Sequence, residues 1–330
     1  MTAEVLDPPD TSERSADGEF IDGLFARLMA AAALTVIAVL VATAVFLLIR
    51  AWPALSHYGP LSFFHARWAP SESAAASSTP NPYGIVQFIY GTVVTSLVAM
   101  VIAVPVAIGV ALYITNLSPA VLRRPLSSLV DLLAAIPSVV YGLWAVFVLV
   151  PLVQDPIGPF LVKYLGWTGF FGGPNFGVGL LTASIILAIM ILPIISSLTR
   201  DMMLAVPNHQ REAVLALGAT RWEMIRTGVL RNARIGIVGA VILGLGRALG
   251  ETMAVAMTIG NHAVISKSLF APGNTLASAI ANEFSEATDD LYLSALIEIG
   301  LALFLVTIVV NAIARLLVWA VTRGAPARVA

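Results

Sequence analysis

Six apolar stretches, each long enough to cross a lipid bilayer, limit what this chain can fold into. A helix needs about 20 mainly apolar residues to cross the hydrocarbon core, and its backbone satisfies its own hydrogen bonds there. Only 11% of the 330 residues are charged, against roughly a quarter in soluble domains. The sequence therefore predicts an all-α membrane protein with six transmembrane helices. We expect these helices at residues 24–49, 88–114, 129–152, 177–198, 236–261 and 292–321.

Lysine and arginine are distributed unevenly between the two sides of this predicted topology. If the N-terminus is inside, thirteen lie on the cytoplasmic side and four lie outside. Cytoplasmic loops carry the excess of positive charge in membrane proteins, so both termini are expected to be cytoplasmic. The inner set is Arg14, Arg27, Arg123, Arg124, Arg200, Arg211, Arg221, Arg226, Arg231, Arg234, Arg315, Arg323 and Arg328. The outer set is Arg50, Arg67, Lys163 and Lys267, and Arg247 remains within the membrane.

Three segments are expected to lie outside the membrane core. Residues 1–23 are polar and acidic and lack the basic region and cleavage site of a secretory signal, so they predict a cytoplasmic tail before a retained helix at 24–49. Residues 50–87 are expected to form an extracytoplasmic loop, and residues 322–330 a second cytoplasmic tail. The remaining residues, 88–321, form the predicted membrane core.

Composition and motifs argue against several kinds of chemistry. The chain has no cysteine, which removes disulfides, thiolate nucleophiles and cysteine-ligated metals. Its four histidines do not form an HExxH or similar spacing, so no metal site and no catalytic residue are expected. A nucleotide-binding P-loop has the pattern GxxxxGK[ST], but Lys163 follows valine and Lys267 follows serine. ATP is therefore not expected to bind to this chain.

The predicted cytoplasmic segment 199–235 has ordered turn chemistry. Pro207 suits the first turn of a helix, and Gly218 suits a left-handed residue just after a helix. Thr220 and Glu223 have the spacing of a capping box, which opens a second helix. The segment therefore predicts two short helices joined by a tight glycine turn. An ordinary basic loop would account for its arginines but not for these turn signals.

This segment resembles the EAA loop of binding-protein-dependent ABC importers. The matching residues are Glu212, Ala213, Val214, Gly218 and Leu230, while Gly228 and Arg231 stand at the family's Ile and Pro positions. The stretches AAIPSVVYGLW (134–144), REAVLALGATRWEMIR (211–226) and GLGRALGETMAVAMTIGN (244–261) are similar to the C-type permease subunits of phosphate-specific transport (Pst) importers. The similarity covers roughly residues 84–320.

The resemblance implies a type I ABC importer transmembrane fold over residues 88–321, in a multi-pass protein of a bacterial cell membrane. It implies a sister permease as heterodimer partner, an ATP-binding cassette ATPase dimer that binds ATP and Mg, and an extracytoplasmic phosphate-binding protein. Inorganic phosphate would be the substrate, with no nucleic-acid partner. This chain itself would be a transport subunit without enzymatic activity or a cofactor. Glu212, Ala213 and Gly218 would couple it to the ATPase.

Two charges, Arg247 and Glu251, lie inside the fifth apolar stretch. A charge at the bilayer centre costs about 2.5–3.5 kcal/mol on insertion scales, so such residues are candidates for function. A spacing of four predicts that the two share a helix face and neutralise each other. One interpretation is a structural ion pair. The other places Arg247, Glu251 and Thr252 in the translocation path, since an arginine fork suits phosphate oxygens. Gly246 and Gly250 are expected to pack against a neighbouring helix.

Other interpretations remain open from the residues alone. An ABC permease for another oxyanion or an organic solute would share the loop and differ near the fifth helix. A proton-coupled secondary transporter would use Glu251 as proton carrier and need no ATPase. An intramembrane enzyme is disfavoured because no GxSxG, HExxH or thiol is present.

The remaining acidic residues are interpreted by position. Asp131 and Glu298 are expected near helix ends, at the membrane interface. The acidic outer loop is interpreted as a docking surface for the binding protein that the resemblance implies, and it carries Glu283, Glu286, Asp289 and Asp290.

Overall fold

The computed structural model describes residues 16–59, 64, 67–70 and 82–322, and these residues are predominantly helical. The α-helices are α1 (Ala16–Tyr58), α3 (Val86–Leu112), α4 (Ala120–Ala135), α5 (Ser138–Trp144), α6 (Val150–Leu152), α7 (Gly158–Leu165), α8 (Leu180–Leu204), α9 (Asn208–Ala216), α10 (Arg221–Glu223), α11 (Arg231–Leu249), α12 (Met253–Thr258), α13 (Leu276–Glu283) and α14 (Asp290–Thr322). Short π-helical turns are η2 (Tyr113–Leu117), η3 (Ala145–Leu149), η4 (Val153–Ile157) and η6 (Met224–Leu230), and η5 (Gly166–Thr168) is 3₁₀. Within these ranges the strand geometry is limited to one antiparallel bridge, between Trp68 and Tyr83.

In the described part of the chain, six helical runs are long and apolar enough to cross a membrane, which confirms the predicted fold class. They are Asp22–Tyr58, Val86–Leu117, Ser138–Thr168, Leu180–Leu204, Arg221–Leu249 and Asp290–Leu316. The cytoplasmic placement of the two ends stays a prediction, because residues 1–15 and 323–330 lie outside the described residues. The acidic tail and the last residues therefore receive no structural account.

The predicted third span, 129–152, is wrong as one continuous helix. Ile136 has an extended conformation, with φ −64° and ψ 130°, so α4 ends at Ala135 and α5 begins at Ser138. The cause is Pro137, because a proline disfavours the helical conformation of the residue before it. Helical structure then continues through η3, α6, η4 and α7 to Thr168.

The chain divides into two compact units, Met1–Ile49 and Arg50–Ala330. In the first unit, α1 is mainly apolar from Leu28 to Ile49, and its side chains from Asp22 to Ile49 are almost all exposed. That surface is consistent with a helix surrounded by lipid or by another subunit.

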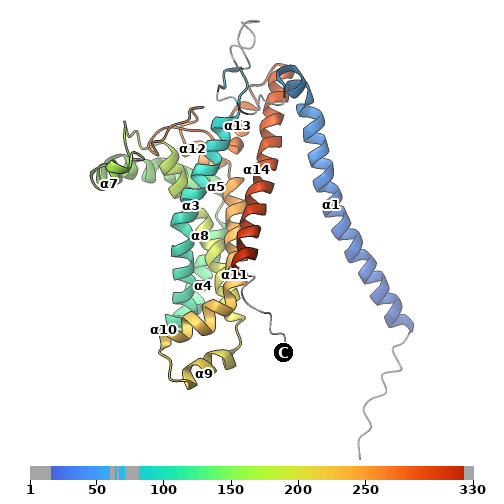
Figure 1. The fold of residues 1–330 in the computed structure, drawn as a ribbon, viewed down its shortest axis with the longest axis vertical. Helices are drawn as coiled ribbons and strands as arrows, with labels where there is room; N and C mark the ends of the chain where they lie inside the picture. The colour runs from blue at the N-terminus through green and yellow to red at the C-terminus, as the bar shows by residue number, and fades with distance from the viewer. Residues whose placement is uncertain (1–15, 60–63, 65–66, 71–81, 323–330) are drawn as a thin grey trace, which may run out of the picture. The chain divides into compact units, whose positions relative to one another are not determined.

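The second unit is built around α8. In the most apolar 18-residue stretch of this helix, 72% of the residues are buried. Four alanines of α3, spaced by four residues, are fully buried: Ala99, Ala103, Ala107 and Ala111. Such a stripe of small residues lets two helices approach closely. Large side chains of α8, including Leu187 and Ile191, fill the space against it. Figure 1 shows α3, α8 and α11 side by side, with α9 and α10 beyond one end of them and α12 and α13 towards the other.

Glu283 anchors an aromatic cluster at the end of the bundle opposite α9. Its Oε2 atom accepts hydrogen bonds from Trp68 Nε1 and from the Tyr292 hydroxyl, both at 2.7 Å. The rings of Trp68 and Tyr292 also pack around Tyr83. Glu283 therefore joins the segment before α3 to α13 and α14. Of the acidic residues expected to form an outer docking surface, Glu283 serves this internal contact, whereas Glu286, Asp289 and Asp290 are exposed.

Candidate functional site

The predicted fifth helix, 236–261, is interrupted in the middle of its apolar stretch. α11 ends at Leu249, and α12 begins at Met253 without a side-chain cap at its N-terminal end. The linking residues Gly250, Glu251 and Thr252 are not α-helical. The two helix ends therefore leave backbone carbonyls and amides without helical partners. Within membranes, broken helices are tolerated where protein or a water-filled cavity surrounds the break.

The predicted ion pair on one helix face is wrong. Because α11 ends at Leu249, Arg247 occupies its last turn while Glu251 lies in the link beyond it. Both side chains are in the described part of the chain, and no salt bridge joins them. Arg247 instead lies at the C-terminal end of a helix, where the helix dipole favours a cation. Self-neutralisation thus does not explain how this arginine is tolerated.

Arg247 lies on an exposed face of α11. Ile235, Gly239, Leu243 and Arg247 are spaced by four residues and are all exposed. Ile235 is 64% exposed and Leu243 57%. Lipid tails can cover the apolar members of this face, but an exposed guanidinium at membrane depth needs a polar environment. This face is therefore where we expect another subunit, a polar path, or both.

Tyr141 belongs to α5. It lies near enough to Arg247 for the two groups to interact electrostatically. Its hydroxyl donates a hydrogen bond of 2.8 Å to the carbonyl of Leu133. α5 and α12 pack closely at Gly142, where an added Cβ would lie 3.0 Å from Ala254 Cα. This contact holds the link after α11 close to α5.

Glu251 is buried, with 9% of its surface exposed. Its carboxylate has no hydrogen-bond or ion-pair partner among the described residues. The Thr252 hydroxyl donates to the carbonyl of Gly250 at 3.3 Å. The structure thus brings Arg247, Glu251 and Thr252 to one helix break, while their role in a path stays a prediction.

The expected packing glycines, Gly246 and Gly250, make no close contact with another element that the structure describes. A Cβ added at Gly246 would meet no atom within 4 Å, and one at Gly250 would meet only the carbonyl of Gly246. The close approaches of α11 to α8 fall at Gly236 and Gly244, where a Cβ would lie 2.3 Å from Met202 and 2.6 Å from Ile195. Packing of Gly246 and Gly250 against another subunit stays a prediction.

The loop between α8 and α11 has the turn chemistry that the sequence predicts. α9 begins after Pro207, and Gly218 has a φ of +82°, in the left-handed region that favours glycine. Thr220 and Glu223 form the capping box, with the Thr220 amide donating to Glu223 Oε2 at 2.8 Å. The second helix is longer than expected, because α10, η6 and α11 form one continuous span from Arg221 to Leu249.

Two polar contacts attach α9 to the spanning helices. Arg211 donates to the carbonyl of Met203 near the end of α8, with Nη2 at 2.7 Å. Asn232, at the start of α11, donates to Gln210 Oε1 at 2.7 Å. α9 is therefore held to both α8 and α11, and the loop is ordered rather than slack.

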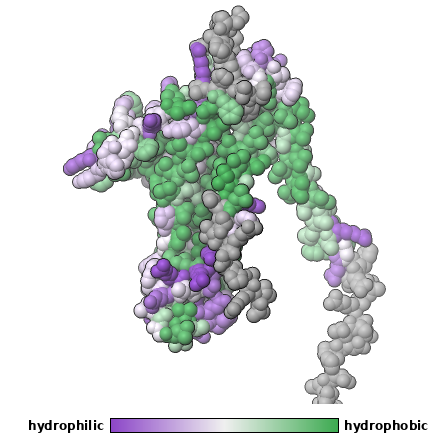
Figure 2. Space-filling model, in the orientation of Figure 1, coloured by the Kyte–Doolittle hydropathy of each residue, from purple (hydrophilic) through white to green (hydrophobic). Residues whose placement is uncertain are grey.

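The outer surface of this loop combines the predicted coupling residues with exposed apolar side chains. Glu212, Ala213 and Gly218 are all exposed. Leu217 is 89% exposed and Trp222 62%. Figure 2 shows apolar residues at the tip of the otherwise polar end that carries α9. The sequence reasoning did not single out Trp222, although a tryptophan beside a capping box in a polar loop was a usable signal. An exposed apolar patch rimmed by charge is typical of a protein-binding surface.

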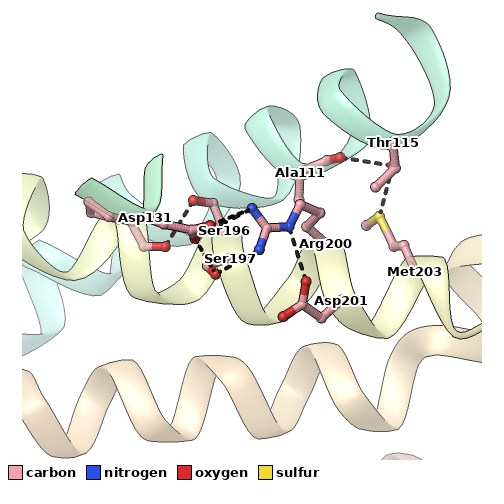
Figure 3. Close-up of polar contacts among 9 residues, drawn as sticks. Ala111, Thr115, Asp131, Ser196, Ser197, Arg200, Asp201 and Met203 are labelled. Carbon is pink, nitrogen blue, oxygen red and sulfur yellow. Dashed lines mark hydrogen bonds and ion pairs between the residues drawn. The ribbon is translucent and has the colours of Figure 1, made fainter. Parts of the chain in front are cut away.

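Arg200, near the end of α8, forms two ion pairs. It contacts Asp131 of α4 at 3.3 Å and Asp201 at 3.0 Å, and Ser197 Oγ donates to Asp131 at 2.9 Å (Figure 3). Asp131 is exposed and ties α4 to α8. Glu298 is 1% exposed and lies inside the bundle, and its expected position at the membrane interface stays a prediction.

The spanning helices and the ordered loop between the fourth and fifth spans define a membrane permease component. Residues 103–323 match the family described as binding-protein-dependent transport system inner membrane component. The protein is therefore a multi-pass inner-membrane protein of this family.

Several relatives share most of their length with the chain. A "Phosphate transport system permease protein PstC" of Mesorhizobium japonicum is 46% identical and covers 89% of each chain. The PstC of Xylella fastidiosa strain 9a5c is 45% identical and covers 98% of this chain and 99% of its own. The PstC of Haemophilus influenzae is 44% identical, and the match covers 91% of this chain and 93% of that relative. The chain thus belongs to the PstC family of permease subunits.

Among solved structures, one described as an inward-facing conformation of the MetNI methionine ABC transporter has a TM-score of 0.49 and 19% identity to this chain. The match covers 70% of this chain and 94% of the chain in that solved structure.

Proposed function

We propose that this chain is the permease subunit of an ATP-driven phosphate importer and forms half of its translocation path. The family relation supports a permease role, and the relatives are named as phosphate transport proteins. The observation that carries the proposal is the exposed guanidinium of Arg247 on the membrane-spanning surface, at the interruption between α11 and α12. A fixed cation in that position attracts an anion and not a neutral solute.

Arg247 offers the translocating phosphate planar, charge-assisted hydrogen bonds. It lies in the final turn of α11, so the main chain fixes its Cα while the side chain reaches outward. Glu251, buried and without a partner among the described residues, sits four residues further on. Its negative charge limits how tightly an anion is held, which favours release over retention. Arg247 and Glu251 thus act on the same ion with opposite sign, and Thr252 adds a hydroxyl beside them.

A partner ATPase supplies the energy in this proposal. That ATPase binds ATP and Mg, and this chain carries no nucleotide or metal cofactor. Glu212, Ala213 and Gly218 belong to the surface on which the ATPase docks, together with the exposed side chains of Leu217 and Trp222. Because α9 is tied to α8 and α11, movement of a docked ATPase reaches the helix that bears Arg247.

The remaining partners follow from uncovered surfaces and from the family. A sister permease covers the exposed α11 face that carries Ile235, Leu243 and Arg247, which completes the path. An extracytoplasmic phosphate-binding protein delivers the ion at the end of the bundle opposite α9. In this arrangement, α9 and both chain termini are cytoplasmic, in agreement with the arginine distribution.

The test is ATP-dependent uptake of radiolabelled phosphate by vesicles that contain the full transporter. Arg247→Gln should reduce uptake to background, while copurification of the partners is unchanged. Arg247→Lys, which keeps the charge but loses the fork, should retain partial uptake. Arg315→Gln, on another exposed arginine of a spanning helix, is the matched control and should transport normally.

Two further measurements distinguish a phosphate importer from a permease for another oxyanion and from a proton-coupled transporter. Unlabelled sulfate should compete poorly, and strong competition would indicate a different oxyanion. Uptake should persist when the proton gradient is collapsed, provided ATP is present. Near-normal phosphate uptake by Arg247→Gln would refute the proposed role of this residue.

A further inference from the structure

An open cleft lies where α3 turns into α4, beside the last turn of α8. Its volume is about 390 Å³, and Leu204, the last residue of α8, forms part of its wall. Because α9 begins a few residues later, the cleft is at the end of the bundle that carries the coupling loop. Its polar lining consists of Thr115, Arg123, Arg124, Ser127, Ser128 and Arg200.

The positive charge in this cleft is only partly neutralised. Arg200 is paired with Asp131 and Asp201, as Figure 3 shows. Arg123 uses its Nε–H for the carbonyl of Ser118 at 3.1 Å, which leaves its other donors available. Arg124 makes no hydrogen bond or ion pair with any residue that the structure describes, and both Arg123 and Arg124 are exposed. Two guanidinium groups and neighbouring serine hydroxyls therefore face the same space without a counter-ion.

An apolar groove begins where the cleft ends. It has a volume of about 470 Å³ and runs between α3 and α4, with Ile114 contributing to both the groove and the cleft. Its walls include Val106 and Gly109 of α3 and Leu129 and Leu133 of α4. Since these residues belong to α3 and α4 on the membrane side of the turn, the groove leads from the cationic cleft into the apolar part of the bundle.

We propose that the cleft and the groove together bind one anionic phospholipid. The headgroup phosphate contacts Arg123 and Arg124, and an acyl chain lies along the groove between α3 and α4. An anionic phospholipid matches both spaces. Its negative headgroup complements the arginines of the cleft, and its apolar tail suits the groove. Free phosphate would use the cleft but leave the groove unfilled, and clusters of arginine at a cytoplasmic membrane surface are typical of anionic-lipid recognition.

The bound lipid would hold the α3–α4 turn against the end of α8. Met203, in the last turn of α8, packs in the same cluster as Ala111 of α3 and Val229 of η6. The site therefore borders the helices that connect the coupling loop to the membrane core. Anionic lipid is expected to stiffen this connection, so the proposal concerns regulation and does not depend on which solute is transported.

The test measures binding of dipalmitoyl phosphatidylglycerol to the full-length chain in detergent by native mass spectrometry. Dipalmitoyl phosphatidylcholine, which has the same chains but no net charge, is the comparison lipid. Combined Arg123→Gln and Arg124→Gln should weaken phosphatidylglycerol binding by about twenty-five-fold, at about fivefold for each arginine near a membrane surface. The matched control is Arg226→Gln with Arg315→Gln, which removes the same charge from exposed positions outside the cleft.

A second variant tests the groove independently of the arginines. An added Cβ at Gly109 meets no atom within 4 Å, so Gly109→Phe can fill the groove without disturbing the backbone. It should weaken phosphatidylglycerol binding while the arginines remain. Gly23→Phe, at a helical glycine of α1 with equally open surroundings, should leave binding unchanged.

Three outcomes would overturn the proposal. Equal binding of phosphatidylcholine would show that charge is not recognised, and equal loss in the control double variant would show only diffuse attraction. Displacement of the lipid by millimolar inorganic phosphate or glycerol 3-phosphate would identify a soluble-phosphate site instead. If the double arginine variant does not fold, the Gly109→Phe and Gly23→Phe pair still decides the outcome.

Discussion

Gly91 and Gly109 both lie in α3, yet alanine at these two positions should change stability in opposite directions. An added Cβ at Gly91 would lie 2.0 Å from the backbone oxygen of Asn274 and 3.0 Å from its carbonyl carbon. Because these are main-chain atoms, no side-chain rotation relieves the overlap. The same region contains a buried hydrogen bond of 2.9 Å from the Leu276 amide to the Thr92 hydroxyl. Moving Asn274 away would strain this bond as well.

The expected magnitude follows from three contributions. Overpacking in a filled interior costs about 1–3 kcal/mol, and loss of the hydrogen bond costs about 0.5–1.5 kcal/mol. Replacing glycine by alanine inside a helix returns about 1 kcal/mol. Gly91→Ala should therefore destabilise the chain by about 0.5–3.5 kcal/mol. Gly109→Ala meets no atom within 4 Å, so only the gain of about 1 kcal/mol remains.

Thermal unfolding of the purified full-length chain in one detergent measures this difference. Gly91→Ala should lower Tm by several degrees relative to the unsubstituted chain, and Gly109→Ala should leave Tm unchanged or raise it. Equal Tm values for the two variants would refute the close packing of α3 on the segment before α13. A Tm for Gly91→Ala above that of Gly109→Ala would refute this close packing more strongly.

Three further substitutions test other contacts. Glu283→Ala removes the shared acceptor of two hydrogen bonds, each worth about 1.5–3 kcal/mol to a charged group, and should lower Tm well below that of Glu286→Ala; similar values would contradict the anchoring role. Leu217→Ser, at a side chain 89% exposed, should leave Tm unchanged but reduce copurification of the ATPase, and undiminished copurification would exclude it from the docking surface. Gly218→Val forces a branched side chain into a φ of +82° at a cost of about 1–2 kcal/mol, and should accelerate amide hydrogen exchange in α9; unchanged exchange would show that the turn tolerates it.

Local signals made the spanning helices and the coupling loop predictable. Hydropathy identifies a span because lipid exposure selects apolar residues over about 20 positions. The turn at Gly218 and the capping box at Thr220 depend only on residues a few positions apart. Both features therefore appear in a single sequence without knowledge of the tertiary fold.

The break after Leu249 was missed although its signal was present. An arginine in the last helical turn followed by glycine is a common helix ending, and Arg247 and Gly250 fit that pattern. The spacing of Arg247 and Glu251 suggested an uninterrupted helix instead, because two charges four residues apart offered a simple way to neutralise them. The apolar residues on both sides concealed the interruption.

Contacts between distant segments could not be predicted from the sequence. Asp131 and Arg200 are 69 residues apart, and Trp68 and Glu283 are 215 residues apart. Each residue alone was consistent with a solvated position near a membrane surface. Glu298 was assigned to the interface for the same reason, although the fold buries it. Such pairs depend on how helices are arranged, which a single sequence does not specify.

The uninterrupted span from Arg221 to Leu249 has a mechanical consequence. Its 29 residues begin at the capping box beside the glycine turn and end at the break beside Arg247. At 1.5 Å per residue, Arg247 lies about 39 Å along this rod from its base. A tilt of about 5° at the base would thus displace the arginine by about 3 Å, roughly the length of one hydrogen bond. Because residues 250–252 are not helical, no continuous helix passes such a displacement on to α12.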